Sequence, residues 1–294
     1  MNKQPREEIS YMINRRTFLK STALGMLGLH LNSSQLLSIS KPNDEVSALL
    51  RKIKISEKNI GGVISQIAYS QIGKPYIGGT LDINQEEKLI YQFDGYDCLT
   101  FVETVLALAR ILIKNKVALE SFKHELTSIR YNRGIINGYA SRSHYTSEWI
   151  SSNKTLGIIK DLSKELGGEL MTNEVNFMST HPQFYKALSA DSTLINSIKA
   201  NEALVNNTER YYIPKSKLEA CDNKIQNGDV LVIATSKSGL DYSHLGFAYR
   251  PKSTKKLHFL HASSNEKKVI LDGEFAKYLD KSKSAIGFSV IRPI

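Results

Sequence analysis

The segment Tyr96-Asp97-Cys98-Leu99-Thr100-Phe101-Val102-Glu103-Thr104-Val105-Leu106 carries a strong periodic pattern. From Cys98 to Leu112, apolar residues recur at steps of one, three and four, which predicts an amphipathic α-helix. Asp97 stands where an N-cap residue belongs. We therefore expect Cys98 to lie in the first turn of this helix.

The predicted elements before this helix differ from those towards the end of the sequence. Residues 45–56 and 60–72 predict two further helices, and the glycine- and proline-rich stretch 72–80 predicts a tight loop. Five short stretches rich in Val, Ile, Leu and aromatic residues predict strands at 229–234, 243–249, 257–262, 268–271 and 285–292. Helices followed by strands indicate an α+β fold with an antiparallel sheet.

Length and composition favour a single globular domain. The chain has 294 residues, of which 41% are hydrophobic, and no apolar run approaches the roughly 20 residues that span a bilayer. We expect one domain over 41–294, elaborated by a mostly helical insertion at about 115–225. The net charge of +10 favours polyanionic partners, yet no nucleic-acid motif accompanies it. The basic surface is either simply solvated or attracted to an anionic cell envelope.

The N-terminus predicts an export signal over residues 1–40. Asn14-Arg15-Arg16-Thr17-Phe18-Leu19-Lys20 precedes a modestly apolar stretch, as in a twin-arginine signal. Ser38-Ile39-Ser40 offers a weak cleavage site. The alternatives are an ordinary amphipathic helix and an uncleaved anchor. Export by this route would place the mature protein in the periplasm.

The chain has two cysteines, Cys98 and Cys221, which is too few for a disulfide scaffold or a paired-cysteine zinc site. A helix N-terminus lowers the pKa of a thiol, because the macrodipole and unpaired N–H groups favour the thiolate. Cys98 is thus a candidate nucleophile. A small buried core thiol and an oxidised pair with Cys221 are the alternatives.

Two histidines in strand context are candidate partners for Cys98. A hairpin turn centred between Lys252 and Ser253 would place His244 directly opposite His261 on one face of the sheet. His261 could then orient His244, and His244 could take the thiol proton. A one-residue slip of register would put His261 on the other face. Two structural histidines are the alternative.

Four motifs together resemble the NlpC superfamily of papain-like bacterial cell-wall cysteine hydrolases, over about residues 58–294. They are Gly73-Lys74-Pro75-Tyr76-Ile77-Gly78-Gly79, Tyr96-Asp97-Cys98-Leu99-Thr100-Phe101, His244-Leu245-Gly246-Phe247 and Phe259-Leu260-His261-Ala262-Ser263. The Cys-Leu-Thr-Phe-Val-Glu sequence, the segment 141–149 and the long middle insertion resemble its N-acetylmuramyl-L-alanine amidase-like branch. Leu99-Thr100 departs from the Ser-Gly that mostly follows the cysteine in this superfamily, so substrate rules of the common endopeptidases are not carried over.

The resemblance implies Cys98 as nucleophile, His244 as base and His261 as the orienting third member. It implies that Tyr76 lines the site near the oxyanion. The implied reaction is cleavage of the amide between N-acetylmuramic acid, in its ordinary or anhydro form, and L-alanine. The implied partners are peptidoglycan or muropeptide fragments, with no cofactor, metal or nucleic acid. Cleavage of the stem peptide after D-glutamate and non-catalytic wall binding are the alternatives.

A second group of side chains is suited to a sugar and a carboxylate, because it combines charge, hydrogen-bonding groups and aromatic faces. We interpret these residues as substrate-binding: Arg142, His144, Tyr145 and Trp149. The alternative is that the aromatic residues belong to the core and that the arginine is a surface charge. A metalloamidase is disfavoured because the sequence lacks His-Glu-x-x-His.

Overall fold

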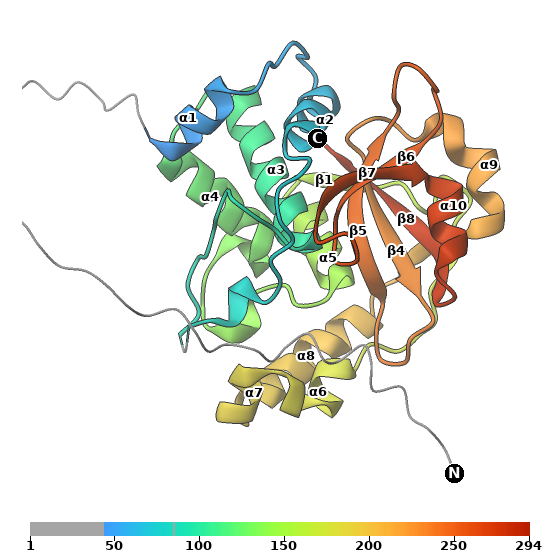
Figure 1. Cartoon of the computed structure of the whole chain (residues 1–294). Helices are drawn as coiled ribbons and strands as arrows, with labels where there is room; N and C mark the ends of the chain where they lie inside the picture. The colour runs from blue at the N-terminus through green and yellow to red at the C-terminus, as the bar shows by residue number, and fades with distance from the viewer. Residues whose placement is uncertain (1–43, 85) are drawn as a thin grey trace, which may run out of the picture. The chain divides into compact units, whose positions relative to one another are not determined.

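The structure, a computed structural model, describes residues 44–84 and 86–294. The predicted export signal and its cleavage site lie outside these residues. Within them, helices pack against an antiparallel sheet, so the expected α+β class is confirmed (Figure 1). No helix in this part of the chain is both long and apolar enough to cross a membrane.

Helix α3 (Cys98–Ile113) is the centre of the helical layer. The predicted helix is present, but its residues are buried without interruption from Thr100 to Ala109, so this part is enclosed on all sides rather than amphipathic. It packs against α2, α4 and strand β5. The other helices of this layer are α1 (Glu45–Arg51), α2 (Ile60–Ser70), α4 (Leu119–Arg130) and α5 (Thr146–Thr155).

The sheet has the strand order β2-β3-β8-β4-β5-β6-β7, and β1 also pairs with β8. All of these pairings are antiparallel. The five predicted strands correspond to β4 (Val230–Thr235), β5 (Tyr242–Tyr249), β6 (His258–Ser263), β7 (Lys268–Glu274) and β8 (Ala285–Pro293).

The segment expected as a mostly helical insertion contributes to both layers. Phe122, Leu126 and Trp149 belong to the same buried cluster as α3. Three short strands of this segment, β1 (Ile159–Asp161), β2 (Glu169–Leu170) and β3 (Tyr211–Pro214), extend the sheet. The remaining helices of the segment are α6 (Phe177–Thr180), α7 (Lys186–Ala190), α8 (Leu194–Asn206) and α9 (Leu218–Cys221).

The two faces of the central strands bury different partners. Leu245 and Phe247 of β5 face the helical layer, where the Phe247 ring meets Phe101 of α3 edge-on at 5.6 Å. Alternate residues face a second cluster, which includes Phe259 of β6 and Phe275 of helix α10 (Phe275–Lys281). The helical layer and α10 lie on opposite sides of the sheet in Figure 1.

A buried ion pair connects α3 to α4. Arg130 Nε donates to Glu103 Oε2 at 2.7 Å, and both side chains are at most 1% exposed. Burial raises the pKa of Glu103, and the Arg130 charge lowers it. Removing one partner would leave the other group polar and buried without compensation.

We expect Glu103→Ala to lower the free energy of unfolding by about 3–5 kcal/mol, because Arg130 would lose its buried counter-charge. The exposed pair between Lys123 and Glu120, at 2.8 Å on α4, is the matched control, and Glu120→Ala should cost less than about 1 kcal/mol. Urea unfolding of both variants measures the difference. Similar losses in the two variants would contradict a special role for the buried pair.

Candidate active site

Cys98 is the first residue of α3, and its position is set by a capping box. The Asp97 carboxylate accepts a hydrogen bond from the Thr100 N–H at 2.7 Å, and the Thr100 hydroxyl accepts one from the Asp97 N–H at 3.0 Å. The prediction that Asp97 is the N-cap is therefore confirmed. Because this box uses the Thr100 N–H, the N–H groups of Cys98 and Leu99 stay available at the helix end.

The environment of the Cys98 thiol opposes its ionisation. Burial raises the pKa of the thiol to about 12, and the Asp97 charge acts in the same direction. Hydrogen bonds from the backbone N–H groups of Leu245, Leu99 and Cys98 itself lower the pKa, but less strongly. The pKa-lowering effect expected from the helix N-terminus is smaller at this thiol than the opposing effect of burial. Cys98 rests as a neutral thiol.

The hairpin that carries the two histidines has a different register from the predicted one. Tyr249 pairs with His258 and Phe247 with Leu260, so His261 lies opposite Gly246 rather than opposite His244. The direct opposition predicted from the sequence is wrong. The cause is the turn, which closes through hydrogen bonds from the N–H groups of Thr254 and Lys255 to the Pro251 carbonyl. A shift of two residues keeps both histidines on one face.

His244 and His261 meet diagonally across this hairpin. His244 Nε2 lies 2.7 Å from His261 Nδ1, and the two rings are nearly perpendicular. Gly246 makes the approach feasible, since a Cβ at this position would lie 2.6 Å from His261 Cβ and 2.7 Å from the Leu260 carbonyl oxygen. Gly246 is thus the residue that admits the His261 side chain beside His244.

Both imidazoles are neutral near neutral pH. Burial, followed by the influence of His261, lowers the pKa of His244 to about 3. Burial lowers the pKa of His261 to about 4, against the opposing charge of Asp272. A neutral His244 has a free lone pair, which is what a general base requires. Leu245, whose N–H contacts the Cys98 sulfur, is the next residue after His244.

Sequence reasoning missed Asp272, which lies behind His261. The Asp272 carboxylate lies 3.8 Å from His261 Nε2, a buried nitrogen without a hydrogen-bond partner in the described part of the chain. This carboxylate favours the tautomer with its proton on His261 Nε2. In that tautomer His261 Nδ1 accepts from His244 Nε2–H, which leaves the His244 Nδ1 lone pair free. The predicted strand ended at Leu271, whereas β7 continues to Glu274, so Asp272 was left outside the sheet.

Tyr278 is the second missed residue. It lies on α10, a helix the sequence analysis did not predict, and its ring packs 5.3 Å from His261 and 6.2 Å from His244, centroid to centroid. Burial raises the pKa of Tyr278, and the Asp272 carboxylate and the thiolate that Cys98 forms at high pH add to this effect. Tyr278 therefore closes the side of the histidine pair that faces α10.

Tyr76 lies close enough to Cys98 for the thiol to affect its pKa, and its place beside the oxyanion stays a prediction. Its backbone pairs with Tyr96 in a short parallel bridge, and its N–H donates to the Lys267 carbonyl at 2.8 Å. Burial raises the pKa of the Tyr76 hydroxyl, and the thiolate that Cys98 forms at high pH is the next cause. The hydroxyl therefore stays protonated and can donate a hydrogen bond.

Three of the four residues interpreted as substrate-binding have polar groups that contact protein partners, whereas the buried Trp149 Nε1 has no hydrogen-bond partner among the described residues. Arg142 forms ion pairs with Asp82 at 2.5 Å and Glu87 at 3.2 Å. His144 Nε2 lies 2.9 Å from the Tyr139 carbonyl oxygen. These contacts stabilise the fold, and a substrate-binding role for the four residues stays a prediction.

The two aromatic members of this group are buried. The Tyr145 hydroxyl donates to Glu202 at 2.7 Å and accepts from the Met178 N–H at the same distance. Trp149 is fully buried within the main core. These positions match the alternative in which both aromatic residues belong to the core.

The second cysteine is separate from this site. Cys221 is 2% exposed and belongs to the apolar cluster on the α10 side of the sheet. Its thiol donates to the Leu218 carbonyl at 3.4 Å, and burial raises its pKa. Both cysteines are free thiols, so the alternative of an oxidised pair is not what the structure contains.

Several solved bacterial structures are similar to this chain over most of its length. The solved structure of an N-acetylmuramoyl-L-alanine amidase from Bacteroides uniformis is 32% identical, covers 80% of this chain and 99% of its own, and gives a TM-score of 0.75. A Bacteroides fragilis protein provisionally titled a xylanase is 36% identical over 76% of this chain and 98% of its own, with a TM-score of 0.72. A Legionella pneumophila protein is 27% identical over 80% and 89%, with a TM-score of 0.63.

A search of curated proteins gave no match. Residues 66–288 match the family described as AmiA-like, N-acetylmuramoyl-L-alanine amidase-like, and this range includes Cys98, His244, His261, Asp272 and Tyr278. The chain belongs to the AmiA-like family of N-acetylmuramoyl-L-alanine amidase-like proteins.

Proposed function

We propose that this protein is a cysteine-dependent amidase that cleaves the bond between the lactyl group of N-acetylmuramic acid and L-alanine in peptidoglycan or its fragments. The observation that carries the proposal is the chain of groups from Cys98 at the start of α3, through the 2.7 Å contact of His244 with His261, to Asp272. Family membership supports the hydrolase class.

The proposed reaction begins with a neutral pair. As the Cys98 sulfur attacks the amide carbon, a C–S bond forms and the thiol proton moves to His244 Nδ1. The oxyanion would accept hydrogen bonds from backbone N–H groups at the start of α3 and from the Tyr76 hydroxyl. When the C–N bond breaks, His244 returns its proton to the amine of L-alanine.

Hydrolysis of the thioester follows the same path in reverse. Water gives a proton to His244 and attacks the thioester carbon, the new C–O bond forms, and the C–S bond breaks. The products are the lactyl carboxylic acid and the restored thiol. Ion-pair formation during attack, rather than before it, follows from the high pKa of Cys98 and the low pKa of His244.

We also propose that the fold is papain-like, as in the NlpC superfamily. The support is a cysteine at the N-terminus of a buried helix, packed on an antiparallel sheet that carries the paired histidines on two neighbouring strands. Within the proposal, 41–294 forms the catalytic domain.

The xylanase title of one structural relative raises a second candidate activity. Glycosidases use two carboxylates that flank the bond to be cut. Among the described residues near Cys98, Asp97 caps α3 and Asp272 faces His261. Because both carboxylates already interact with groups of the protein, catalysis by a thiol with an imidazole base is better supported than glycosidase catalysis by two carboxylates.

We further propose that the chain works in the periplasm, because residues 1–40 resemble a twin-arginine signal and the substrate class is extracytoplasmic. Cell fractionation should find the mature protein in the periplasm. Replacing Arg15 and Arg16 by Lys should retain it in the cytoplasm. Unchanged periplasmic localisation of that variant would contradict the twin-arginine route.

The proposed bond is tested by mass analysis of products from defined muropeptides. We expect a free stem peptide that begins with L-alanine, together with a sugar that carries a lactyl carboxylate. Cys98→Ala should abolish the products, whereas Cys221→Ala should retain them, because Cys221 is a buried core thiol that bonds only the Leu218 carbonyl among the described residues. A dipeptide ending in D-glutamate would instead show stem-peptide cleavage, and full activity of Cys98→Ala would remove the cysteine mechanism.

The hydrogen-bonded pair of His244 and His261 predicts a particular pH dependence of activity. Protonated His244 cannot act as a base, and its pKa lies below the ordinary value of 6.5, so activity should persist on acidification past that value. In a kcat/KM profile the acidic limb should therefore fall well below pH 6.5. A limb centred at 6.5 or above would contradict a buried, neutral base.

Asp272→Asn tests the role of the carboxylate behind His261. We expect it to lower kcat by about tenfold or more, because it removes the charge that favours the proton on His261 Nε2. It should also move the acidic limb to lower pH, because losing the Asp272 charge disfavours a proton on the hydrogen-bonded pair of His261 and His244. Asp280→Asn, on the exposed face of α10, is the control and should alter neither quantity. An unaltered pH profile in Asp272→Asn would leave Asp272 a structural residue.

A further inference from the structure

The Asp272 carboxylate lies at an irregularity of the sheet. Between β6 and β7 the pairing shifts by one residue, so that two residues of β7, Asp272 and Gly273, face the single residue Phe259 of β6. This is the arrangement of a β-bulge, which disrupts the regular ladder of hydrogen bonds and bends the strand. The position of the Asp272 carboxylate beside His261 therefore depends on the contacts that hold this bulge.

Two hydrogen bonds hold the bulge. Asp272 Oδ1 accepts from the Gly273 N–H at 2.6 Å, which fixes the carboxylate relative to its own backbone. The Asp272 carbonyl oxygen lies 3.0 Å from His258 Nδ1, a contact that fixes the backbone of the bulge relative to β6. The other carboxylate oxygen, Oδ2, is left facing His261 Nε2.

Both contacts of the His258 ring agree on one tautomer. A carbonyl oxygen can only accept, so His258 Nδ1 carries the proton in the contact with Asp272. In the neutral ring Nε2 then accepts, and the Thr254 hydroxyl lies 3.4 Å from it. An imidazolium also carries a proton on Nδ1, so the hydrogen bond to Asp272 does not depend on the charge of His258.

Asp272 acts on His261 without a direct hydrogen bond. The 3.8 Å between Asp272 Oδ2 and His261 Nε2 exceeds hydrogen-bond range, so the carboxylate influences the ring through its charge. That influence weakens as the distance grows. A movement of the bulge away from β6 would therefore reduce it even while the carboxylate is still present.

The other ionisable groups around Asp272 and His261 constrain the bulge less than this hydrogen bond does. Lys281 Nζ of α10 lies 3.7 Å from Asp272 Oδ1, but the lysine side chain is 69% exposed, and exposed ion pairs contribute little. Tyr278 of α10 and His244 of β5 contact the His261 ring, and both are neutral near neutral pH.

We propose that His258 is a positioning residue for the catalytic histidines, because it holds the bulge that directs the Asp272 carboxylate at His261. His258 is half-buried and lies three residues before His261 on β6, so one strand carries both the ring and the donor that holds its partner. The inference rests on the proposed function, in which Asp272 supports His261 and His261 orients His244. His258 acts in it only through Asp272.

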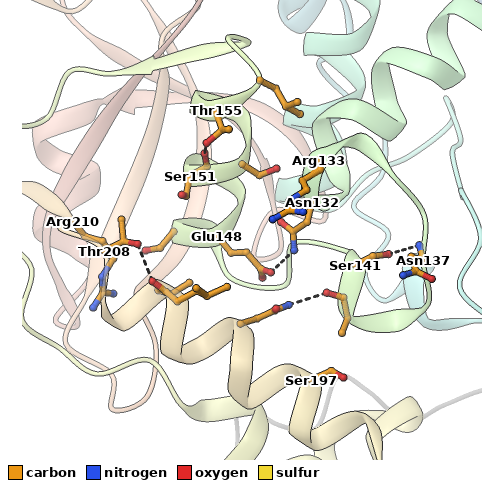
Figure 2. Close-up of a pocket in the computed structure, with 17 residues that line it drawn as sticks. Asn132, Arg133, Asn137, Ser141, Glu148, Ser151, Thr155, Ser197, Thr208 and Arg210 are labelled. Carbon is orange, nitrogen blue, oxygen red and sulfur yellow. Dashed lines mark hydrogen bonds between the residues drawn. The ribbon is translucent and has the colours of Figure 1, made fainter.

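A polar pocket between α5 and α8 lies outside this arrangement and supplies a distant control. Its volume is about 610 Å³, and the described residues that line it include none from β5, β6, β7 or α10. Figure 2 shows Thr155 of α5 at this pocket, where its hydroxyl donates to the Ser151 carbonyl at 3.0 Å. Thr155→Val therefore removes an exposed threonine hydroxyl that has no part in the histidine network.

Steady-state kinetics on the full chain test the proposal. His258→Phe keeps a ring and removes the donor, and we expect it to lower kcat about fivefold or more and to move the acidic limb to lower pH, as Asp272→Asn does. His258→Leu, a second variant without the donor, should behave alike. His258→Asn should keep about half of kcat or more, because its amide nitrogen can still donate. Thr254→Val, which leaves the Nδ1 contact in place, and Thr155→Val should leave both quantities unchanged.

The double variant His258→Phe with Asp272→Asn separates positioning from a general loss of stability. Because His258 acts through Asp272, the double variant should have the kcat of Asp272→Asn alone, within about twofold. Losses that multiply in the double variant would overturn the proposal. Unchanged kcat and pH profile in both donor-free variants would overturn it too, as would a His258→Asn variant as impaired as they are.

Imidazole ¹⁵N spectra at neutral pH give a measurement that needs no catalysis. In the unaltered chain His261 should carry its proton on Nε2, and in His258→Phe its ring-nitrogen shifts should move partway towards those of Asp272→Asn. Unmoved His261 shifts in the donor-free variants would overturn the inference whether or not the protein is an amidase. An unaltered chain that forms no products while the His261 shifts move as expected would remove the proposed function alone, so the two failures are distinguishable.

Discussion

The structure depends on how helix α3 begins and where it is buried. The Asp97–Thr100 capping box fixes the first turn, and the following residues are buried between α2, α4 and the sheet. Phe101, three residues after Cys98, packs against Phe247 of β5. Because β5 also carries His244, this contact holds the thiol beside the strand of the proposed base. The buried residues of α3 cannot shift without exposing the core, and they thereby fix the position of the Cys98 thiol.

Burial determines the electrostatics as well as the position. It raises the pKa of Cys98 and lowers the pKa of His244, so both groups are neutral before substrate arrives. A neutral thiol resists adventitious oxidation better than a thiolate does. Charge would develop only as the thiol attacks, where the oriented N–H groups at the start of α3 can stabilise it without reorganisation. Asp272 and Tyr278 complete the surroundings of the histidine pair from β7 and α10.

The sequence supports prediction best where a local pattern determines the structure. The helix at Cys98, its Asp97 cap and the five strands follow from periodicity and capping chemistry. The register of the β5–β6 hairpin, which sets how the two histidines meet, does not follow from such patterns. It depends on a turn closed by hydrogen bonds to the Pro251 carbonyl, which composition alone does not specify. Asp272 and Tyr278 were missed because they come from a strand extension and a short helix whose formation depends on tertiary packing. Likewise, the burial of Arg142 and Trp149 depends on contacts distant in sequence.

The most direct test of the central claim is the mass of the covalent intermediate on Cys98. A muropeptide reaction quenched in acid within its first turnovers and then digested should yield a peptide containing Cys98 with an added N-acetylmuramoyl group in thioester linkage. That mass would establish the nucleophile and the bond together. A stem-peptide acyl group on Cys98 would place the cut elsewhere. An unmodified Cys98 peptide during active turnover, under conditions that preserve thioesters, would contradict cysteine catalysis.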